Sequence, residues 1–153
     1  MQRGDTRIDI SIRDQTLTVA RGDETLRTYP ISTSRFGLGT EEGSLKTPTG
    51  KFRIAAKIGY EVPADTIFVG RVPLGPEEIP PATEDFVMAR ILWLDGTEEQ
   101  NANTRDRYIY IHGTTHEDKI GTPDSHGCIR MRNADVIELF DLVEQDTPVM
   151  IRA

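Results

Sequence analysis

The residues of this chain best suited to chemistry are one cysteine and the histidines around it. Cys128 is the only cysteine, and it lies in the run Ser-His-Gly-Cys-Ile-Arg over residues 125–130. A lone cysteine forms no intramolecular disulfide, and this one follows a glycine and has polar neighbours instead of an apolar run. A single cysteine that the fold brings near a histidine is a candidate nucleophile with its base. The sequence therefore predicts thiolate chemistry at Cys128, because the thiolate is the reactive form.

Three histidines are candidates for the base: His112, His116 and His126. His126 stands two residues before Cys128, where strand side chains share a face, but this position is poorly placed for in-line proton transfer. His112 ends a short β-rich segment and could approach Cys128 from a neighbouring strand, with its other ring nitrogen held by a backbone carbonyl. We therefore predict His112 as the base. For His126 a direct role and a loop-supporting role both stay open, and His116 is expected to be a solvated loop residue.

Other groups of the same run could orient a substrate. The amides of Gly127 and Cys128 could point at a developing oxyanion, and Gly127 has no side chain to block a substrate. Arg130 suits a substrate carboxylate because its guanidinium fork matches one, and the alternative is an ion pair that braces the loop. Ser125 fits a hydrogen-bonding turn residue better than a nucleophile. Asp124 precedes the run by a turn, so we expect a backbone carbonyl to orient the imidazole in place of an acid.

A metal site is the main alternative chemistry. The three histidines and Cys128 together could be interpreted as zinc ligands. The spacing of His112 and His116 would suit a helix, but both follow a strand and straddle a Gly-Thr turn. No Cys-x-x-Cys pair is present in the sequence. We therefore expect neither a metal nor a cofactor.

Length, charge and hydropathy limit the classes of protein. A chain of 153 residues fits one domain over 1–153 with one sizeable core. The net charge of −7, without a block of Lys and Arg, argues against a nucleic-acid partner. No apolar stretch approaches the roughly 20 residues that span a bilayer. Residues 1–5 lack the apolar core of a secretory signal, so a cytoplasmic protein and a mature or truncated form are the alternatives.

The elements that must position this site are mostly strands. Apolar and polar residues alternate over residues 8–19 and again over 25–31, which predicts an opening meander. Residues 32–46 are rich in Gly, Ser, Thr and Glu, and we expect a long exposed loop. The run Thr-Pro-Thr-Gly at 47–50 suits a turn before a strand at 51–54.

The middle of the chain is less regular and leads to the first candidate histidine. Residues 59–85 hold several prolines and predict an irregular excursion, either a functional lid or a simple insertion. The apolar run 86–94 predicts a buried strand that ends in an Asp-Gly turn at 95–96. Residues 97–107 predict a loop, and 108–111 predict a strand with His112 at its end.

Residues 133–143 predict the one clear helix. Asn133 is a good N-cap, and Asp135 in the first turn favours the helix dipole. Apolar residues recur at three- and four-residue spacing and are expected to face the core, namely Val136, Ile137, Phe140 and Val143. Residues 147–148 end this helix, and 149–151 predict a last strand.

The run around the cysteine resembles the signature of the L,D-transpeptidase catalytic domain, the YkuD domain. That signature is a histidine, a gap of fixed range, and then Ser/Thr-His-Gly-Cys, an apolar residue and Arg or Asn. Here His112 stands sixteen positions before Cys128, within the range usual for the family. The run at 47–50, the opening strands and the closing strand also resemble the family. The resemblance covers most of the chain and is weak over 59–107.

This resemblance implies a mainly β fold, a β-sandwich-like mixed sheet with one helix beside it, and an enzyme that cross-links peptidoglycan stem peptides. Cys128 would attack the carbonyl of a meso-diaminopimelate residue in a donor tetrapeptide and release D-alanine. The thioester would pass to the side-chain amine of an acceptor stem, whereas transfer to water would make an L,D-carboxypeptidase. His112 would be the base, and the other site residues would be Gly113, which orients it, and Ser125, His126, Gly127 and Arg130, which line the site.

The resemblance also implies partners and a location. The partners would be tetrapeptide stems of peptidoglycan, and carbapenems would form acyl adducts on the cysteine. The location would be the cell envelope or periplasm, although no signal peptide is visible in the sequence. A non-catalytic module that holds wall peptide is the remaining alternative, and the presence of both His112 and Cys128 argues against it.

Overall fold

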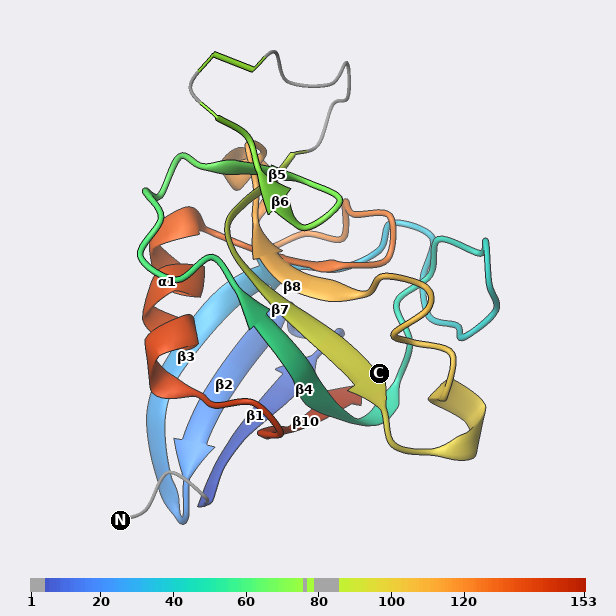
Figure 1. Ribbon diagram of the computed structural model, residues 1–153. Helices are drawn as coiled ribbons and strands as arrows, with labels where there is room; N and C mark the ends of the chain where they lie inside the picture. The colour runs from blue at the N-terminus through green and yellow to red at the C-terminus, as the bar shows by residue number, and fades with distance from the viewer. Residues whose placement is uncertain (1–4, 76, 79–85) are drawn as a thin grey trace.

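The strands of this computed structural model, which describes residues 5–75, 77–78 and 86–153, form one sheet. The strands are β1 (Thr6–Ser11), β2 (Thr16–Arg21), β3 (Glu24–Ser32), β4 (Gly50–Ile58), β5 (Ile67–Val69), β6 (Val72–Pro73), β7 (Val87–Gly96), β8 (Tyr110–Gly113), β9 (Ile129–Met131) and β10 (Pro148–Arg152). Their order is β4-β10-β1-β2-β3-β9-β8-β7-β5-β6, and β4 also pairs with β7. The sheet therefore curls back on itself, and the β5–β6 hairpin extends from β7 (Figure 1).

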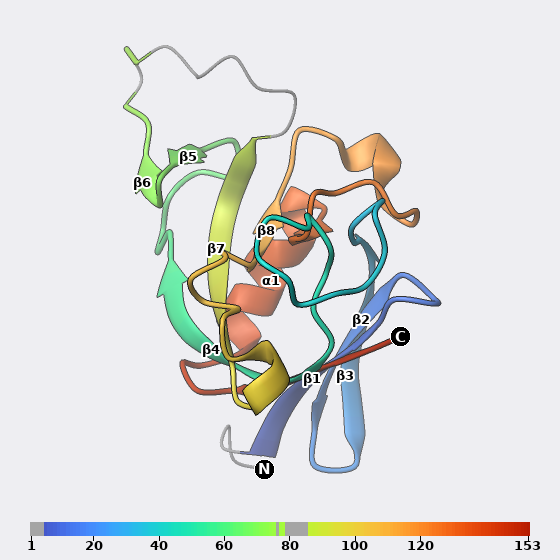
Figure 2. The ribbon, with the colours of Figure 1, turned by 90° about the vertical axis from the view of Figure 1, so that its right-hand side faces the viewer.

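The helix α1 (Asn133–Leu142) lies between the two halves of this curled sheet. Figure 2 shows it with β4 and β7 on one side and β1–β3 on the other. The prediction of a mainly β fold with one α-helix is confirmed for the described residues, and the sandwich takes the form of a single closed sheet. The other described helices are the short 3₁₀ turns η2 (Glu99–Asn101) and η3 (Glu117–Lys119). In the described part of the chain, no helix is long and apolar enough to cross a membrane.

The opening meander follows the alternation of the sequence. β1, β2 and β3 pair antiparallel, and Ile8, Ile10, Leu17 and Val19 are all buried in the main core. β10 returns to pair parallel with β1, with Ile8 opposite Val149. A half-buried strand with this period of two buries its apolar side chains on one face, which is why this part was predictable.

The start of α1 differs from the prediction. The N-cap is Arg132, without a side-chain capping bond, and Asn133 is already helical. The Asn133 Oδ1 instead accepts a hydrogen bond of 2.8 Å from the Thr114 amide, which ties the helix to the end of β8. The buried residues of the helix are Val136, Leu139 and Phe140, with Val143 just beyond it, whereas Ile137 is only partly buried.

Two predicted turns are wrong. Asp95 and Gly96 lie inside β7, where Gly96 pairs with Phe52 of β4. A Cβ on Gly96 would stand 1.9 Å from the Asn101 carbonyl oxygen, so this glycine permits a close approach and not a turn. Residues 47–50 run directly into β4, and Thr47 is buried.

The two predicted loops contain more structure than expected. Residues 32–34, at the start of the predicted exposed loop, are buried. The excursion over 59–85 contains the β5–β6 hairpin, which pairs with the start of β7. Pro76, Pro80 and Pro81 of that excursion, and residues 1–4, lie outside the described residues.

Candidate active site

The parallel pair β8–β9 brings the predicted nucleophile and base together. Ile111 is opposite Ile129, and His112 is opposite Arg130. Cys128 directly precedes β9, and its Sγ accepts a hydrogen bond of 3.3 Å from the Tyr110 amide. Side chains two residues apart on a strand share a face, so His112 and Cys128 lie on the same face of this pair. The sequence predicted His112 at the end of a strand over 108–111, whereas the structure places His112 inside β8.

The two faces of β8–β9 differ in what they contact. Ile111 and Ile129 point into the main core. Tyr110 and Cys128 belong to a second apolar cluster on the opposite face, together with Phe68 of the β5–β6 hairpin, Ile91 and Trp93. Cys128 therefore lies outside the main core, under the hairpin, in a half-buried position.

The two backbone contacts of the Cys128 sulfur act in opposite directions on its ionisation. The Sγ–H donates a hydrogen bond of 3.4 Å to the Tyr108 carbonyl, which favours the thiol, and the sulfur accepts one of 3.3 Å from the Tyr110 amide, which favours the thiolate. Burial holds the pKa of Arg107 below its usual value, and the attraction of a negative charge on Cys128 opposes this shift in part. The same attraction stabilises the negative sulfur, and so does a hydrogen bond donated to it. Arg107 did not stand out in the sequence, because only the fold places it near the cysteine.

His112 is buried and held in one orientation. Its Nδ1 contacts the Gly113 carbonyl oxygen. A carbonyl only accepts, so Nδ1 carries the proton and Nε2 is the acceptor nitrogen of the neutral imidazole. A Cβ on Gly113 would lie 2.2 Å from Asn133 Oδ1 and 2.8 Å from the Met88 carbonyl oxygen. Only glycine fits at this position, which explains the residue beside the histidine.

Ser125 folds the loop that leads to the cysteine. Its hydroxyl donates to the Cys128 carbonyl at 2.6 Å, and the Gly127 amide donates to that hydroxyl at 3.3 Å. The Gly127 carbonyl accepts a hydrogen bond of 2.9 Å from Thr47 Oγ1. The first residue of the 47–50 run therefore helps to hold the cysteine loop in place. The expected orientation of the Gly127 amide toward an oxyanion is therefore wrong, because that amide is bound to Ser125.

Arg130 is buried in an ion pair. Its side chain is 1% exposed, and its Nη1 lies 2.6 Å from the Asp124 carboxylate. Burial would raise the pKa of Asp124, but the hydrogen bond and charge of Arg130 outweigh it and hold this pKa below its usual value. This geometry favours the loop-bracing alternative over a contact with a substrate carboxylate. Asp124 is thus a structural partner that the sequence did not single out.

Asp124→Asn is expected to lower the free energy of unfolding by about 3 kcal/mol at neutral pH, because the buried Arg130 charge loses its carboxylate. The folded-state pKa of Asp124 is lowered, so this stabilisation is present above the usual pKa of 3.8 and is lost as the pH falls through the folded-state value. The difference should therefore shrink below about pH 4 in urea titrations.

Asp146→Asn is the matched control for this measurement. Asp146 forms an equally short ion pair, 2.6 Å from Arg53, but the Asp146 side chain is 70% exposed. An exposed pair contributes less than about 1 kcal/mol, so this variant should unfold close to the native protein. Equal losses in both variants would contradict a special role for the buried pair.

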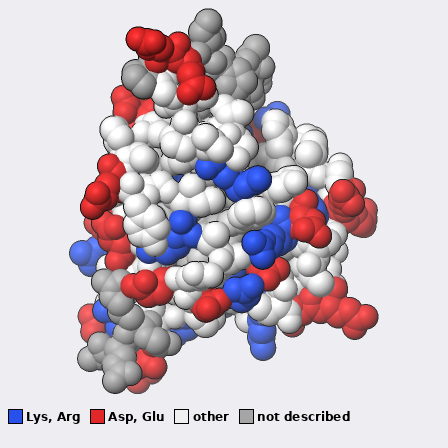
Figure 3. All heavy atoms as spheres, viewed as in Figure 1, with Lys and Arg blue, Asp and Glu red and all other residues white. Residues whose placement is uncertain are grey.

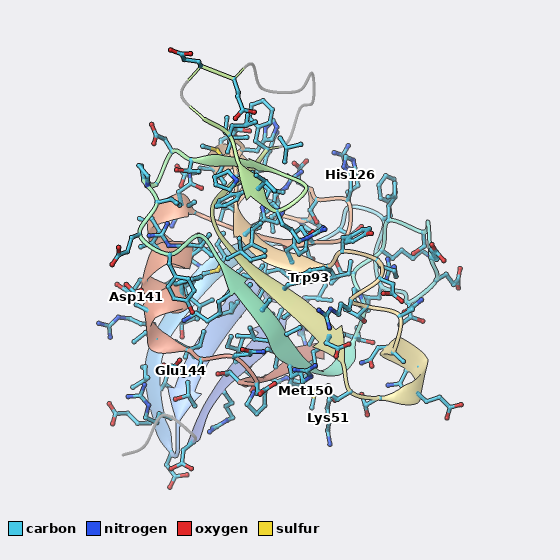
Figure 4. All side chains as sticks on the ribbon, viewed as in Figure 1. Lys51, Trp93, His126, Asp141, Glu144 and Met150 are labelled. Carbon is cyan, nitrogen blue, oxygen red and sulfur yellow. The ribbon has the colours of Figure 1, made fainter. Side chains whose placement is uncertain are left out.

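The other two histidines are more exposed than His112. His126 is exposed, and its ring stacks on Phe36 with 5.9 Å between the ring centroids. Figure 4 shows it pointing away from the sheet. His116 is half-buried before η3, not solvated as expected. Within residues 5–75, 77–78 and 86–153, no three His, Cys, Asp or Glu side chains are grouped so that they could hold a metal ion.

A pocket of about 290 Å³ opens beside the nucleophile. Leu45, Arg107, Tyr108, Ile109 and His126 are among its lining residues. Because the carbonyl of Tyr108 contacts the Cys128 sulfur, this pocket adjoins the candidate nucleophile. A substrate that reaches Cys128 from this side would meet both apolar surface and the Arg107 charge.

Comparison with known proteins finds relatives of this chain. A sequence model described as the YkuD L,D-transpeptidase catalytic domain matches residues 5–151. The protein named as the L,D-transpeptidase YkuD of Bacillus subtilis (strain 168) is 31% identical over 144 residues, which are 94% of this chain and 64% of that protein. This chain therefore spans somewhat less than two thirds of that relative.

Solved structures share the fold. An L,D-transpeptidase from Xylanimonas cellulosilytica superposes with a TM-score of 0.64 at 18% identity, over 99% of this chain and 62% of that one. L,D-transpeptidase 3 from Mycobacterium tuberculosis, in complex with a faropenem-derived adduct, gives a TM-score of 0.62 at 17% identity, over 97% of this chain and 60% of that one. At these identities the likeness establishes the fold alone.

Proposed function

This chain belongs to the YkuD family of L,D-transpeptidase catalytic domains, and from this premise we propose that it is a cysteine-dependent acyltransferase of peptidoglycan stem peptides. One observation supports this most. Cys128 and His112 share a face of the β8–β9 pair, and the Nδ1 of His112 contacts the Gly113 carbonyl. With the proton on Nδ1, Nε2 is the proton acceptor of an imidazole on the same face as the nucleophile.

The first half-reaction transfers the thiol proton to His112 and forms the Cys128 thioester. The thiolate attacks the carbonyl between the diaminopimelate residue and the terminal D-alanine of a tetrapeptide. The carbon–nitrogen bond breaks, and the leaving amine takes the proton back from Nε2. The Tyr110 amide and the Arg107 charge support this step because they stabilise the thiolate before attack.

The second half-reaction releases the acyl group. A neutral side-chain amine of an acceptor stem attacks the thioester, its proton passes to Nε2, and the carbon–sulfur bond breaks. The products are a cross-linked peptide and a cysteine that returns to its thiol or thiolate form. Water in place of the amine would give a tripeptide, which is the L,D-carboxypeptidase reaction.

We place this activity in one catalytic domain, residues 1–153, at the cell envelope, where peptidoglycan is found. A carbapenem would compete as an acyl donor, because its strained carbonyl can be attacked by the same thiolate. The faropenem-derived adduct of a protein with this fold supports that expectation.

Incubation with a disaccharide-tetrapeptide is the direct test of the proposed reaction. The expected product is a cross-linked dimer that has lost one D-alanine, detected by mass spectrometry. A tripeptide without dimer would replace the transpeptidase by a carboxypeptidase. Unchanged tetrapeptide, from folded protein with a reduced Cys128, would contradict both reactions and favour a non-catalytic wall-peptide-binding module.

A further inference from the structure

Positive charge is concentrated on the face of the molecule that carries the nucleophile. The chain has a net charge of −7. Figure 3 nevertheless shows Lys and Arg gathered over the middle of the face that carries β4 and β7, with Asp and Glu mostly toward its edges. Trp93 lies at the centre of this face (Figure 4). An anionic ligand would therefore be drawn to the surface around Trp93.

Two arginines and three aromatic side chains form this centre, which we call the arginine–aromatic cluster: Arg71, Trp93, Arg105, Tyr108 and Tyr110. The Cζ of Arg71 lies 4.6 Å from the Trp93 ring centroid and 5.2 Å from that of Tyr108. The Cζ of Arg105 lies 5.1 Å from Trp93. The Arg71 Nη1 donates a hydrogen bond of 2.9 Å to the Tyr110 hydroxyl. Flat stacking on rings fixes a guanidinium while leaving its edge available for a ligand.

This cluster directly adjoins the candidate nucleophile. The carbonyl of Tyr108 and the amide of Tyr110 both contact the Cys128 sulfur. Tyr110 therefore connects the two residues: its hydroxyl binds Arg71, and its backbone amide binds the Cys128 sulfur. A peptide whose carbonyl is attacked by the sulfur would place its neighbouring residue close to Arg71.

The backbone of Arg71 is in a conformation that arginine rarely adopts. Gly70 and Arg71 form the two-residue connection of the β5–β6 hairpin, with φ of 55° and 69°. Such turns favour glycine or asparagine at both positions, because a Cβ is strained at positive φ. Strained backbone of this kind is common at functional sites, which favours a functional role for the Arg71 side chain.

The guanidinium of Arg71 also lacks an acidic partner. In the described part of the chain, its hydrogen-bond partner is the neutral Tyr110, and no carboxylate pairs with it. Arg130, in contrast, already pairs with Asp124. Of these two arginines near the nucleophile, Arg71 is therefore the one free to bind a carboxylate of a substrate.

We propose that Arg71 is the specificity residue that binds a free carboxylate of the donor peptide beside the scissile bond, with that peptide packed on Trp93 and Tyr108. This inference rests on the proposed function and adds a binding group to it. Position favours the donor over the acceptor. The donor carbonyl must reach the Cys128 sulfur, which adjoins the arginine–aromatic cluster, and a donor stem carries carboxylates near that carbonyl.

Donor binding in a Cys128→Ala background tests this proposal without turnover. Arg71→Gly is added to that background, because glycine suits the turn and should leave the melting temperature unchanged or higher. Calorimetry with the tetrapeptide donor should show a Kd at least about tenfold weaker, the loss expected for a charge-assisted hydrogen bond. With a donor whose carboxylates are amidated, Arg71→Gly should make no difference. Arg71→Lys should restore only part of the affinity, because lysine has the charge but not the fork.

Arg13→Gln is the matched control, since it removes an exposed arginine in the turn after β1. It should leave the Kd unchanged. The proposal is overturned if Arg71→Gly binds the donor as its parent does, if amidated and native donors are affected equally, or if the Cys128→Ala protein does not bind the donor. Failure of the proposed function has a different signature: the native protein would make no product even though this carboxylate-dependent binding is observed.

Discussion

Cys128→Ala is expected to remove product formation from a disaccharide-tetrapeptide, by about 10⁴-fold or more, because no other side chain can form the thioester. The carbapenem adduct, visible as a mass increase on the native protein, should be absent from this variant. Cys128 is half-buried and contributes only a small side chain to the second apolar cluster. The melting temperature should therefore change little, so lost activity cannot be attributed to unfolding.

Cys128→Ser is the informative control for this result. It keeps the shape of the side chain and the contacts with Tyr108 and Tyr110, but a hydroxyl ionises far less readily than a thiol. We expect the variant to bind the donor and to turn it over at the assay background. Cross-linking or D-alanine release that persists in either variant would remove the nucleophile role from Cys128 and with it the proposed reaction.

The parts of the fold that could be predicted are those in which a local pattern determines the element. The alternation over residues 8–19 determined β1 and β2, because one face of each strand must be buried. The helix at 133–142 followed from its apolar spacing. Its N-cap was wrong because the Asn133 side chain binds the Thr114 amide, a contact made across the fold. The Asp-Gly pair at 95–96 was wrong for the same reason, since Gly96 is required by a neighbour, Asn101.

The site shows the same limit. Cys128 and His112 could be proposed from residue type and spacing, because reactive side chains in a short run are visible in the sequence. The partner of Arg130 could not, since Asp124 becomes an ion-pair partner only when the loop folds around Ser125. Arg71, on a hairpin far from the motif in the sequence, carried no signal of its own.

His112→Ala is expected to slow acylation of Cys128 by about 10²–10⁴-fold, the usual loss when a general base is removed. The rate is measured as the appearance of the carbapenem adduct, which reports the first half-reaction alone. Without the imidazole, the thiol must ionise unaided. The residual rate should therefore rise with pH until the Cys128 thiol is fully ionised. A pH profile thus separates loss of the base from general damage to the site.

His126→Ala is the matched control for the base. His126 stands closer to Cys128 in the sequence, but its ring is exposed and stacked on Phe36, on the outer side of the loop. Its removal should leave the rate of acylation nearly unchanged. The opposite result, a slow His126→Ala and an unaffected His112→Ala, would transfer the base to His126. The contact between His112 and Gly113 would then be a structural one, because a buried imidazole also needs a hydrogen-bond partner.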